Sequence, residues 1–428
     1  MSQSWALRCQ ILSCTAQPNE HKGWFYHSDG LIWVDDGFIK RVGSYSELKV
    51  CLPSDIAIEH RPDHLLTPGF IDTHVHYPQL EMIAAYGTQL LDWLNRYTFP
   101  VELKYRDIDY ATEQAGWFLD QLLANGTTTA MVFATSSVNS VDAFFTESLR
   151  RNLRMVSGKV LMDRHAPDEL CDSAQSAYDD TSALINKWRG KGRLGYAVTP
   201  RFAPTSTDAQ LEVAGALIKE NGDAYLHTHL SENVDEVAWV GELFPDSQGY
   251  LDTYDHYGLV TDRSVFAHGI HLSDAEMDRL HECGSAVCHC PSSNLFLGSG
   301  LFPLKRLQKA GVTVTMGTDV GGGTSLSMLS TQGDAYKIQQ LAGNLLKPLD
   351  AFYMATLAGA KALGLDDRIG ALIEGYEADM VLIDLASTPV IEARIRQANH
   401  IEDVLFALSI LGDDRSIAQT YIMGEPRL

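Results

Sequence analysis

Residues 69–76 read Gly-Phe-Ile-Asp-Thr-His-Val-His, an apolar run that ends in polar side chains. A short apolar run of this kind predicts a buried β-strand. Because the side chains of a strand alternate between its two faces, His74 and His76 should point to the same side. Two imidazoles so placed can share one metal ion, but polar caps at a strand end give the same pattern.

Seven further apolar runs follow, and helical stretches separate most of them, for example residues 209–219 and 233–241. This alternation is typical of βαβ units and a parallel sheet. Eight such units over roughly 300 residues predict a TIM (β/α)8 barrel. A doubly wound sheet is the competing fold, but the chain lacks the GxGxxG turn of its nucleotide-binding forms. The eight runs are 69–76, 127–134, 154–162, 194–202, 224–230, 264–272, 285–291 and 312–319.

Strand patterns also occur near both ends of the chain, at residues 5–13, 30–42, 379–384 and 419–423. The second of these reads as two strands joined by an Asp-Asp-Gly turn. Two β-rich ends can pair with each other. We therefore expect a small β-sandwich domain made of residues 1–67 and 370–428, with the barrel inserted as residues 68–369.

Composition and net charge indicate which broad class of protein this chain belongs to. Of the 428 residues, 45% are hydrophobic and 21% are charged, which suits a folded core. Lys plus Arg number 33 and Asp plus Glu 55, and the net charge of −22 disfavours nucleic acid and anionic membranes as partners. No apolar stretch approaches the ~18 residues of a membrane span. The first 18 residues show no signal-peptide pattern, and seven cysteines fit no disulfide framework. We expect a soluble, cytoplasmic protein.

Side chains that bind metal ions gather at the C-terminal ends of the predicted strands, where a barrel builds its active site. The fifth run ends near His229 and Glu232, the sixth carries His268, and the eighth ends in Asp319. Three imidazoles and one carboxylate suit Zn²⁺ or Fe²⁺ with a position left open for water. Ordinary strand caps would have no reason to gather at the same end of several runs. The expected metal ligands are therefore His74, His76, His229 and Asp319.

The fourth run bears on the number of metal ions. Two-metal barrels of this general kind use a modified lysine on the fourth strand as a bridging ligand. Residues 196–201 read Tyr-Ala-Val-Thr-Pro-Arg, without a lysine. Lys159 lies on the third run, where we expect its ammonium to extend to solvent. One metal ion per subunit is favoured.

Residues 68–76, together with the later histidines and Asp319, resemble the amidohydrolase superfamily. More narrowly, the chain is similar to the guanine deaminase family over nearly its whole length. Superfamily motifs are shared by many activities, whereas residues 91–100 (LDWLNRYTFP) and 200–205 (PRFAPT) are much more specific. The match continues in residues 76–79, 229–233, 291–295 and 411–416.

The resemblance implies a β-sandwich beside a barrel, one Zn²⁺ per subunit with Fe²⁺ as an alternative, and a homodimer. It implies hydrolysis of guanine to xanthine and ammonia by a metal-activated water. Asp319 would take a proton from that water, and His268 would orient the hydroxide. Glu232 would protonate the ring nitrogen next to the attacked carbon and then the departing amine.

Three residues are implied as substrate contacts. The guanidinium of Arg201 matches the O6 and N7 acceptors of guanine, and Gln79 offers a donor and an acceptor to another edge. Phe202 can lie against the ring face. Trp93 is a further candidate for the pocket wall. The structural alternatives are a rim salt bridge for Arg201, core packing for Phe202 and helix packing for Trp93.

Other functions stay open at this point. A mononuclear hydrolase of the same type can act on other purines, adenosine-like nucleosides or triazines. A two-metal ring hydrolase such as a dihydropyrimidinase is disfavoured by the missing lysine. A scaffold that lost catalysis usually loses metal ligands, and here every expected ligand is present.

Overall fold

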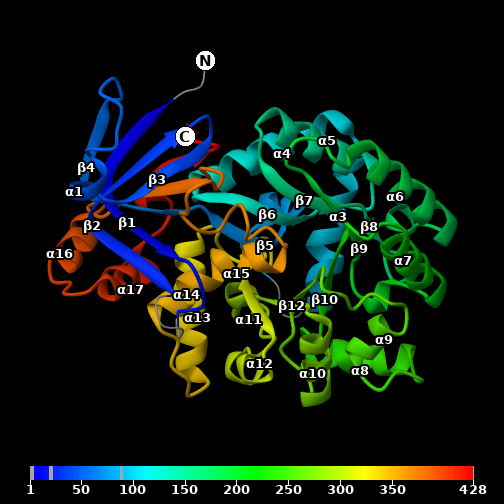
Figure 1. Cartoon of the computed structure of the whole chain (residues 1–428). Helices are drawn as coiled ribbons and strands as arrows, with labels where there is room; N and C mark the ends of the chain where they lie inside the picture. The colour runs from blue at the N-terminus through cyan, green and yellow to red at the C-terminus, as the bar shows by residue number, and fades with distance from the viewer. Residues whose placement is uncertain (1–3, 19–22, 87–89, 428) are drawn as a thin grey trace.

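The computed structural model describes residues 4–18, 23–86 and 90–427. In this part of the chain a curled parallel sheet surrounded by helices lies beside a second sheet that both chain ends build (Figure 1). The first and last strands of the chain lie together at one side of the molecule, as their blue and red colours show. The predicted barrel with a small β domain is confirmed.

The barrel strands lie in the order in which they occur in the sequence and pair in parallel. Each predicted run contains a strand, and the third run is divided in two at Lys159. Two backbone hydrogen bonds close the barrel: Asp319 N–H donates to His74 O, and His76 N–H donates to Val320 O, each at 2.9 Å. The described strands are β5 (Phe70–His76), β6 (Thr127–Phe133), β7 (Arg154–Gly158), β8 (Val160–Leu161), β9 (Gly195–Pro200), β10 (Tyr225–Leu230), β11 (Ser264–His268), β12 (Ala286–His289) and β13 (Thr313–Met316).

Lys159 does not reach solvent, so the prediction for its side chain was wrong. The side chain is 1% exposed, and its ammonium pairs with the carboxylate of Asp172. The carboxylate of Asp180, on the helix Ala174–Trp188, lies 3.7 Å from the same ammonium. These carboxylates come from later in the chain, and no local pattern around Lys159 could place them.

Helices surround the barrel, and local signals explain where they begin. The predicted helix at 209–219 is α7, which starts where the Thr207 side chain accepts a hydrogen bond from Gln210 N–H. The predicted helix at 233–241 is α8, which begins at a capping box formed by Asn233 and Glu236. The larger barrel helices are α4 (Ile108–Ala124), α5 (Val138–Arg150), α6 (Ala174–Trp188), α7 (Asp208–Glu220), α8 (Val234–Leu243), α9 (Tyr250–Asp255), α10 (Asp274–Cys283), α11 (Pro291–Phe296), α12 (Leu304–Ala310), α13 (Met328–Leu341), α14 (Pro348–Met354) and α15 (Leu357–Ala362).

A chain of short helical segments lies between β5 and α4 and contributes to the pocket. It consists of η1 (Tyr77–Met82), α2 (Leu90–Trp93), the π-helical η2 (Leu94–Thr98), α3 (Phe99–Glu102) and η3 (Leu103–Arg106). We call residues 90–106 the helical arm. It carries the whole family-like segment at residues 91–100.

The second sheet has its strands in the order β16-β15-β14-β4-β1-β2-β3 within the described residues. They are hydrogen-bonded as one sheet, where we expected a sandwich. The sequence did not indicate β4, because its first half is exposed and charged; this strand lies between the two chain ends and joins them. The strands are β1 (Trp5–Cys14), β2 (Trp24–Asp35), β3 (Phe38–Ser44), β4 (Ile58–Pro68), β14 (Met380–Asp384), β15 (Ile417–Ile422) and β16 (Glu425–Pro426), with helices α1 (Tyr45–Leu48), α16 (Pro389–Ile395) and α17 (Ile401–Leu411).

We propose that the two units divide at residues 67/68 and 369/370, as expected from the sequence. At the first boundary β4 continues into β5 through Gly69, where an added Cβ would meet Thr128 Oγ1 at 2.2 Å. Beyond the second, Leu372 N–H donates to Ser13 Oγ at 2.9 Å, within the sheet unit. In the part of the chain that the structure describes, no helix is long and apolar enough to cross a membrane.

Candidate active site

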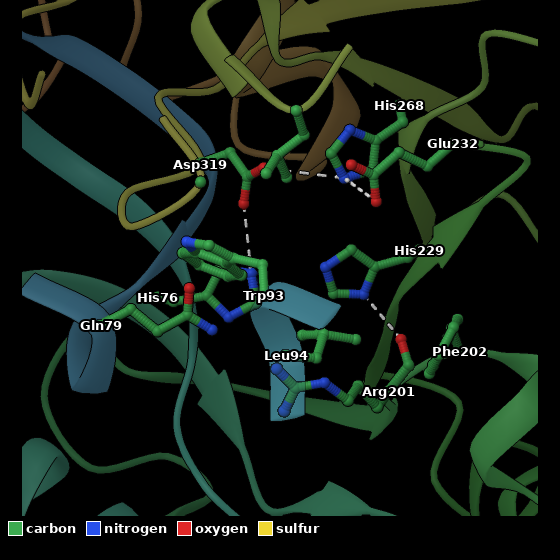
Figure 2. A pocket seen from close by; sticks show the side chains of 12 residues that line it. His76, Gln79, Trp93, Leu94, Arg201, Phe202, His229, Glu232, His268 and Asp319 are labelled. Carbon is green, nitrogen blue, oxygen red and sulfur yellow. Dashed lines mark hydrogen bonds and ion pairs between the residues drawn. The ribbon is translucent and has the colours of Figure 1, made fainter. Parts of the chain in front are cut away.

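One pocket opens at the C-terminal ends of the barrel strands (Figure 2). All but one of the site residues expected from the sequence line it. The exception, His74, is completely buried behind His76. Leu94 and Leu297 add apolar walls. The lining residues are His76, Gln79, Trp93, Leu94, Arg201, Phe202, His229, Glu232, His268, Leu297, Asp319 and Gly322.

Four of these expected residues converge on one point; we call His74, His76, His229 and Asp319 the metal cluster. One ligand atom from each lies within 4.8 Å of all the others. Asp319 Oδ1 is 3.1 Å from His74 Nε2 and 3.2 Å from His76 Nε2, and the two nitrogens are 3.2 Å apart. Zn–N bonds of about 2.0–2.1 Å put tetrahedral ligand atoms about 3.3 Å apart, so this spacing fits a divalent ion.

The protonation state of the histidines is also the one that metal binding requires. His229 Nδ1 lies 2.7 Å from the carbonyl oxygen of Arg201, which can only accept, so Nδ1 carries the hydrogen and Nε2 keeps its lone pair. Burial lowers the pKa of His74 and His229 and lowers that of His76 to about 3. Neutral imidazoles are the form that binds metal ions.

His227, in the middle of β10, supports the metal cluster through His74. Its Nε2 is 2.8 Å from Nδ1 of His74. If His74 binds a metal through Nε2, its Nδ1–H donates to His227, and such a bond fixes the ring and raises its basicity as a ligand. Because strand side chains alternate, His227 and His229 share a face of β10, but only the folded structure brings His227 to His74.

The backbone conformation of His268 and Asp319 determines the direction of their side chains. His268 and Asp319 have φ values of 71° and 50°. Residues other than glycine rarely adopt this left-handed region, and where they do the surroundings must hold them there. His268 is the last residue of β11 and Asp319 follows the end of β13, so the turn redirects side chains that a strand pattern alone would place differently.

Glu232 and His268 lie together on the side of the pocket above the metal cluster. Their closest atoms, Glu232 Oε2 and His268 Nε2, are 3.4 Å apart, and Asp319 Oδ2 is 3.7 Å from the same nitrogen. His268 Nδ1 lies 2.9 Å from the amide oxygen of Asn294, which fixes the ring. Burial, helped by the charge of Asp319, raises the pKa of Glu232 to about 8. A carboxyl group of this pKa can hold and release a proton near neutral pH.

The opposite side of the pocket holds a hydrogen-bonded set that we call the polar corner: Gln79, Glu102 and Arg201. Arg201 Nη1 donates to both carboxylate oxygens of Glu102 at 2.9 Å. Gln79 Nε2 lies 3.4 Å from Glu102 Oε1, and Gln79 Oε1 accepts from Gly321 N–H at 3.2 Å. Sequence analysis missed Glu102, because it lies on the short helix α3 of the arm.

Aromatic residues complete the walls. Phe202 and Trp93 line the pocket and belong to one apolar cluster with Leu94 and Phe99. Trp93 is buried, and its Nε1–H donates to the carbonyl oxygen of Ala85 at 3.2 Å. Phe99 lies beneath the guanidinium of Arg201, 5.4 Å from ring centroid to Cζ. Several of these rings come from the helical arm.

Cys290 lies close to the metal cluster. His74, His268, Cys290 and Asp319 form a second group whose ligand atoms lie within 4.8 Å of one another. It shares His74 and Asp319 with the metal cluster. Cys288 is different: Thr73 Oγ1 donates to its sulfur at 3.1 Å inside the barrel.

Comparison with known proteins places the chain in a family. Residues 65–427 match the model of the amidohydrolase family. The chain is 50% identical to the guanine deaminase of Escherichia coli (strain K12) over 396 residues, which cover 92% of this chain and 90% of that protein. The solved structure of E. coli guanine deaminase has a TM-score of 0.96 and 47% identity, and covers 99% of both chains.

A second solved structure is that of guanine deaminase from C. acetobutylicum with bound guanine in the active site. It has a TM-score of 0.90 and 29% identity, and it covers all of this chain and of its own. The family match, the share of sequence identity and the structural likeness agree over most of the chain. The chain therefore belongs to the amidohydrolase family and, within it, to the guanine deaminases.

Proposed function

We propose that this chain hydrolyses guanine to xanthine and ammonia in the pocket described above, with one divalent metal ion in the metal cluster. The observation that carries the proposal is the placement of the metal cluster, Glu232 and the polar corner around one small cavity. A purine ring held by the polar corner would have its other end near the proton-handling groups. The guanine-bound relative supports the choice of base.

The metal ligands proposed are His74, His76, His229 and Asp319. When bound, the ion supplies Lewis acidity that lowers the pKa of water toward about 7. Zn²⁺ is proposed because three neutral imidazoles and a carboxylate suit it, and Fe²⁺ suits the same set.

The chain's own residues then handle the protons. Asp319 directs Oδ1 to the histidines of the metal cluster, and its Oδ2 is turned toward His268 and is placed to accept a proton from the attacking water. His268, fixed by Asn294, orients that water toward C2 of guanine, the carbon that carries the amine. Glu232 gives its proton to the neighbouring ring nitrogen, takes up the proton of the hydroxyl added at C2 and delivers it to the departing amine, and the proton held by Asp319 then restores Glu232. Each positioned transfer contributes about 10²–10⁴-fold.

Arg201 and Gln79 are proposed to bind the purine edges, and Phe202 and Trp93 to lie against the ring. Arg201 keeps donors for O6 and N7 of guanine, where adenine presents an amino group instead. The structural alternative for Arg201 was a salt bridge at the rim; Arg201 does form a salt bridge, but with the fully buried Glu102, and it still lines the pocket, so the pair is compatible with substrate binding. We also propose a homodimer and a cytoplasmic location, which rest on the family resemblance and the composition.

The proposal is tested with purified, zinc-loaded protein by following ammonia and xanthine formation from guanine. Adenine, cytosine and 8-oxoguanine serve as parallel substrates. Turnover that is selective for guanine is the expected result. Turnover of another base in place of guanine would keep the metal cluster but overturn the roles of Arg201 and Gln79. No turnover of any base, with metal bound, would overturn the proposed reaction.

A further inference from the structure

We propose that Glu102 is a specificity-determining positioning residue: it makes the polar corner a wall of hydrogen-bond donors, which selects purines with an oxygen at C6. This inference deepens the proposed function and rests on it for the identity of the substrate. Glu102 is not placed to take part in the chemistry. It is argued to act through Arg201 and Gln79.

Burial and charge are the first step. The side chain of Glu102 is 0% exposed and that of Arg201 is 3% exposed. A guanidinium without a partner in such a place would be strongly destabilised, because desolvation of an unpaired charge is costly. Glu102 neutralises it, and so the cation can stand at the pocket wall before any substrate arrives.

Geometry is the second step. Both carboxylate oxygens of Glu102 accept from the same nitrogen of Arg201, Nη1, at 2.9 Å each. Among the residues that the structure describes, Nε and Nη2 of Arg201 have no hydrogen-bond partner, and Arg201 lines the pocket. The pairing therefore fixes the plane of the guanidinium while it leaves donors for a ligand.

The amide of Gln79 is fixed in the same way. Its oxygen accepts from Gly321 N–H at 3.2 Å, and its nitrogen lies 3.4 Å from Glu102. The bond from Gly321 orients the amide so that its oxygen faces the backbone of residue 321, and the second N–H of the amide is left for the pocket. From the sequence, Gln79 could serve as donor or acceptor; next to Glu102 and Gly321 it serves as a donor.

A wall of hydrogen-bond donors selects against purines that lack a hydrogen-bond acceptor at position 6. A 6-oxopurine presents O6 and N7, which are both acceptors, to such a wall. A 6-aminopurine keeps N7 but presents a donor at position 6. Unsubstituted purine also keeps N7 and has only a C–H group at position 6. Buried donors left without a partner disfavour binding, so the wall rejects both. Figure 2 shows Gln79 and Arg201 on the side of the pocket away from Glu232 and His268.

The experiment is direct binding to zinc-loaded protein by calorimetry, with hypoxanthine, adenine and unsubstituted purine as probes. None of the three carries an amine at C2, so binding is measured without the proposed reaction. The wild-type chain should favour hypoxanthine. Glu102→Gln should weaken hypoxanthine binding by about 10- to 100-fold, because the cation loses its charged partner and the wall loses its order. Purine binding should change by less than about threefold.

The matched control is Glu377→Gln. Glu377 also pairs with arginines in a largely buried place, at 2.7 Å from Arg193, but far from the pocket on the sheet unit. Its replacement should lower the melting temperature without changing the preference for hypoxanthine. Equal losses for all three ligands in Glu102→Gln would show a merely structural role and overturn the inference.

A double variant tests whether Glu102 acts through Arg201. If it does, Glu102→Gln in an Arg201→Ala background should weaken hypoxanthine binding no further than Arg201→Ala alone, apart from the small part carried by Gln79. Additive losses would contradict action through Arg201. Unchanged or tighter hypoxanthine binding in Glu102→Gln would also overturn the inference. If the wild type binds hypoxanthine selectively but does not turn over guanine, the proposed function fails while the donor wall stands.

Discussion

The metal cluster and the polar corner share one pocket but are built in different ways. Every member of the metal cluster lies at or just beyond the C-terminal end of a barrel strand. The polar corner takes Gln79 from η1, Glu102 from α3 and Arg201 from the end of β9. The barrel strands themselves hold the metal ligands in place. The position of the substrate-binding side chains depends in addition on how the short helices pack against the barrel. The two parts meet where His229 contacts the backbone carbonyl of Arg201, but no side chain belongs to both, so we expect a side-chain substitution in one part to leave the other in place.

Loss of a metal ligand should have the largest effect and should leave the polar corner unchanged. We expect His76→Ala to reduce guanine turnover to background, because even a lost supporting hydrogen bond near a metal costs about 10–100-fold and a lost ligand costs more. Chelation of the wild type should do the same, and added Zn²⁺ should restore it. Metal content per chain and turnover are measured together. Full activity in a metal-free sample would contradict the metal cluster as the reactive centre.

Glu232→Gln should separate metal binding from proton transfer. The amide keeps the size of the side chain but cannot carry the proton, so kcat should fall by about 10²–10⁴-fold. Metal content and the binding of hypoxanthine should stay close to those of the wild type. Steady-state kinetics and metal analysis check this pair of outcomes, and near-normal kcat would remove Glu232 from the mechanism.

The contrast between the two parts explains what the sequence could and could not predict. His74, His76 and His229 follow apolar runs, and parallel strands bring such ends together, so the sequence predicts the metal cluster. Glu102 lies in a segment without helical or strand periodicity, and only tertiary packing brings it to Arg201. The strand β4 was missed for a related reason, since its exposed, charged first half hides the pattern of its buried end.

Arg201→Ala should affect recognition and leave the metal cluster intact. Loss of the guanidinium removes the donors for the 6-oxopurine edge and leaves Glu102 buried without its cation. We expect the KM for guanine to rise by about 10- to 100-fold with a smaller change in kcat. Arg201→Lys is the matched variant, which keeps the charge but not the planar fork. A KM equal to that of the wild type would exclude Arg201 from substrate binding.

Trp93→Ala should have the smallest effect on catalysis. The indole belongs to the helical arm and is not one of the proposed metal ligands, and an aromatic contact contributes about 2- to 10-fold in affinity. We expect a rise of that size in the KM for guanine, unchanged metal content, and a clear fall in melting temperature, because a buried ring leaves a cavity. Trp93→Phe should recover most of the affinity, since it keeps a ring and loses only the hydrogen bond to Ala85. If Trp93→Ala lowered metal content as well, the arm and the barrel end would be one coupled unit, and the independence of the metal cluster from the polar corner would be wrong.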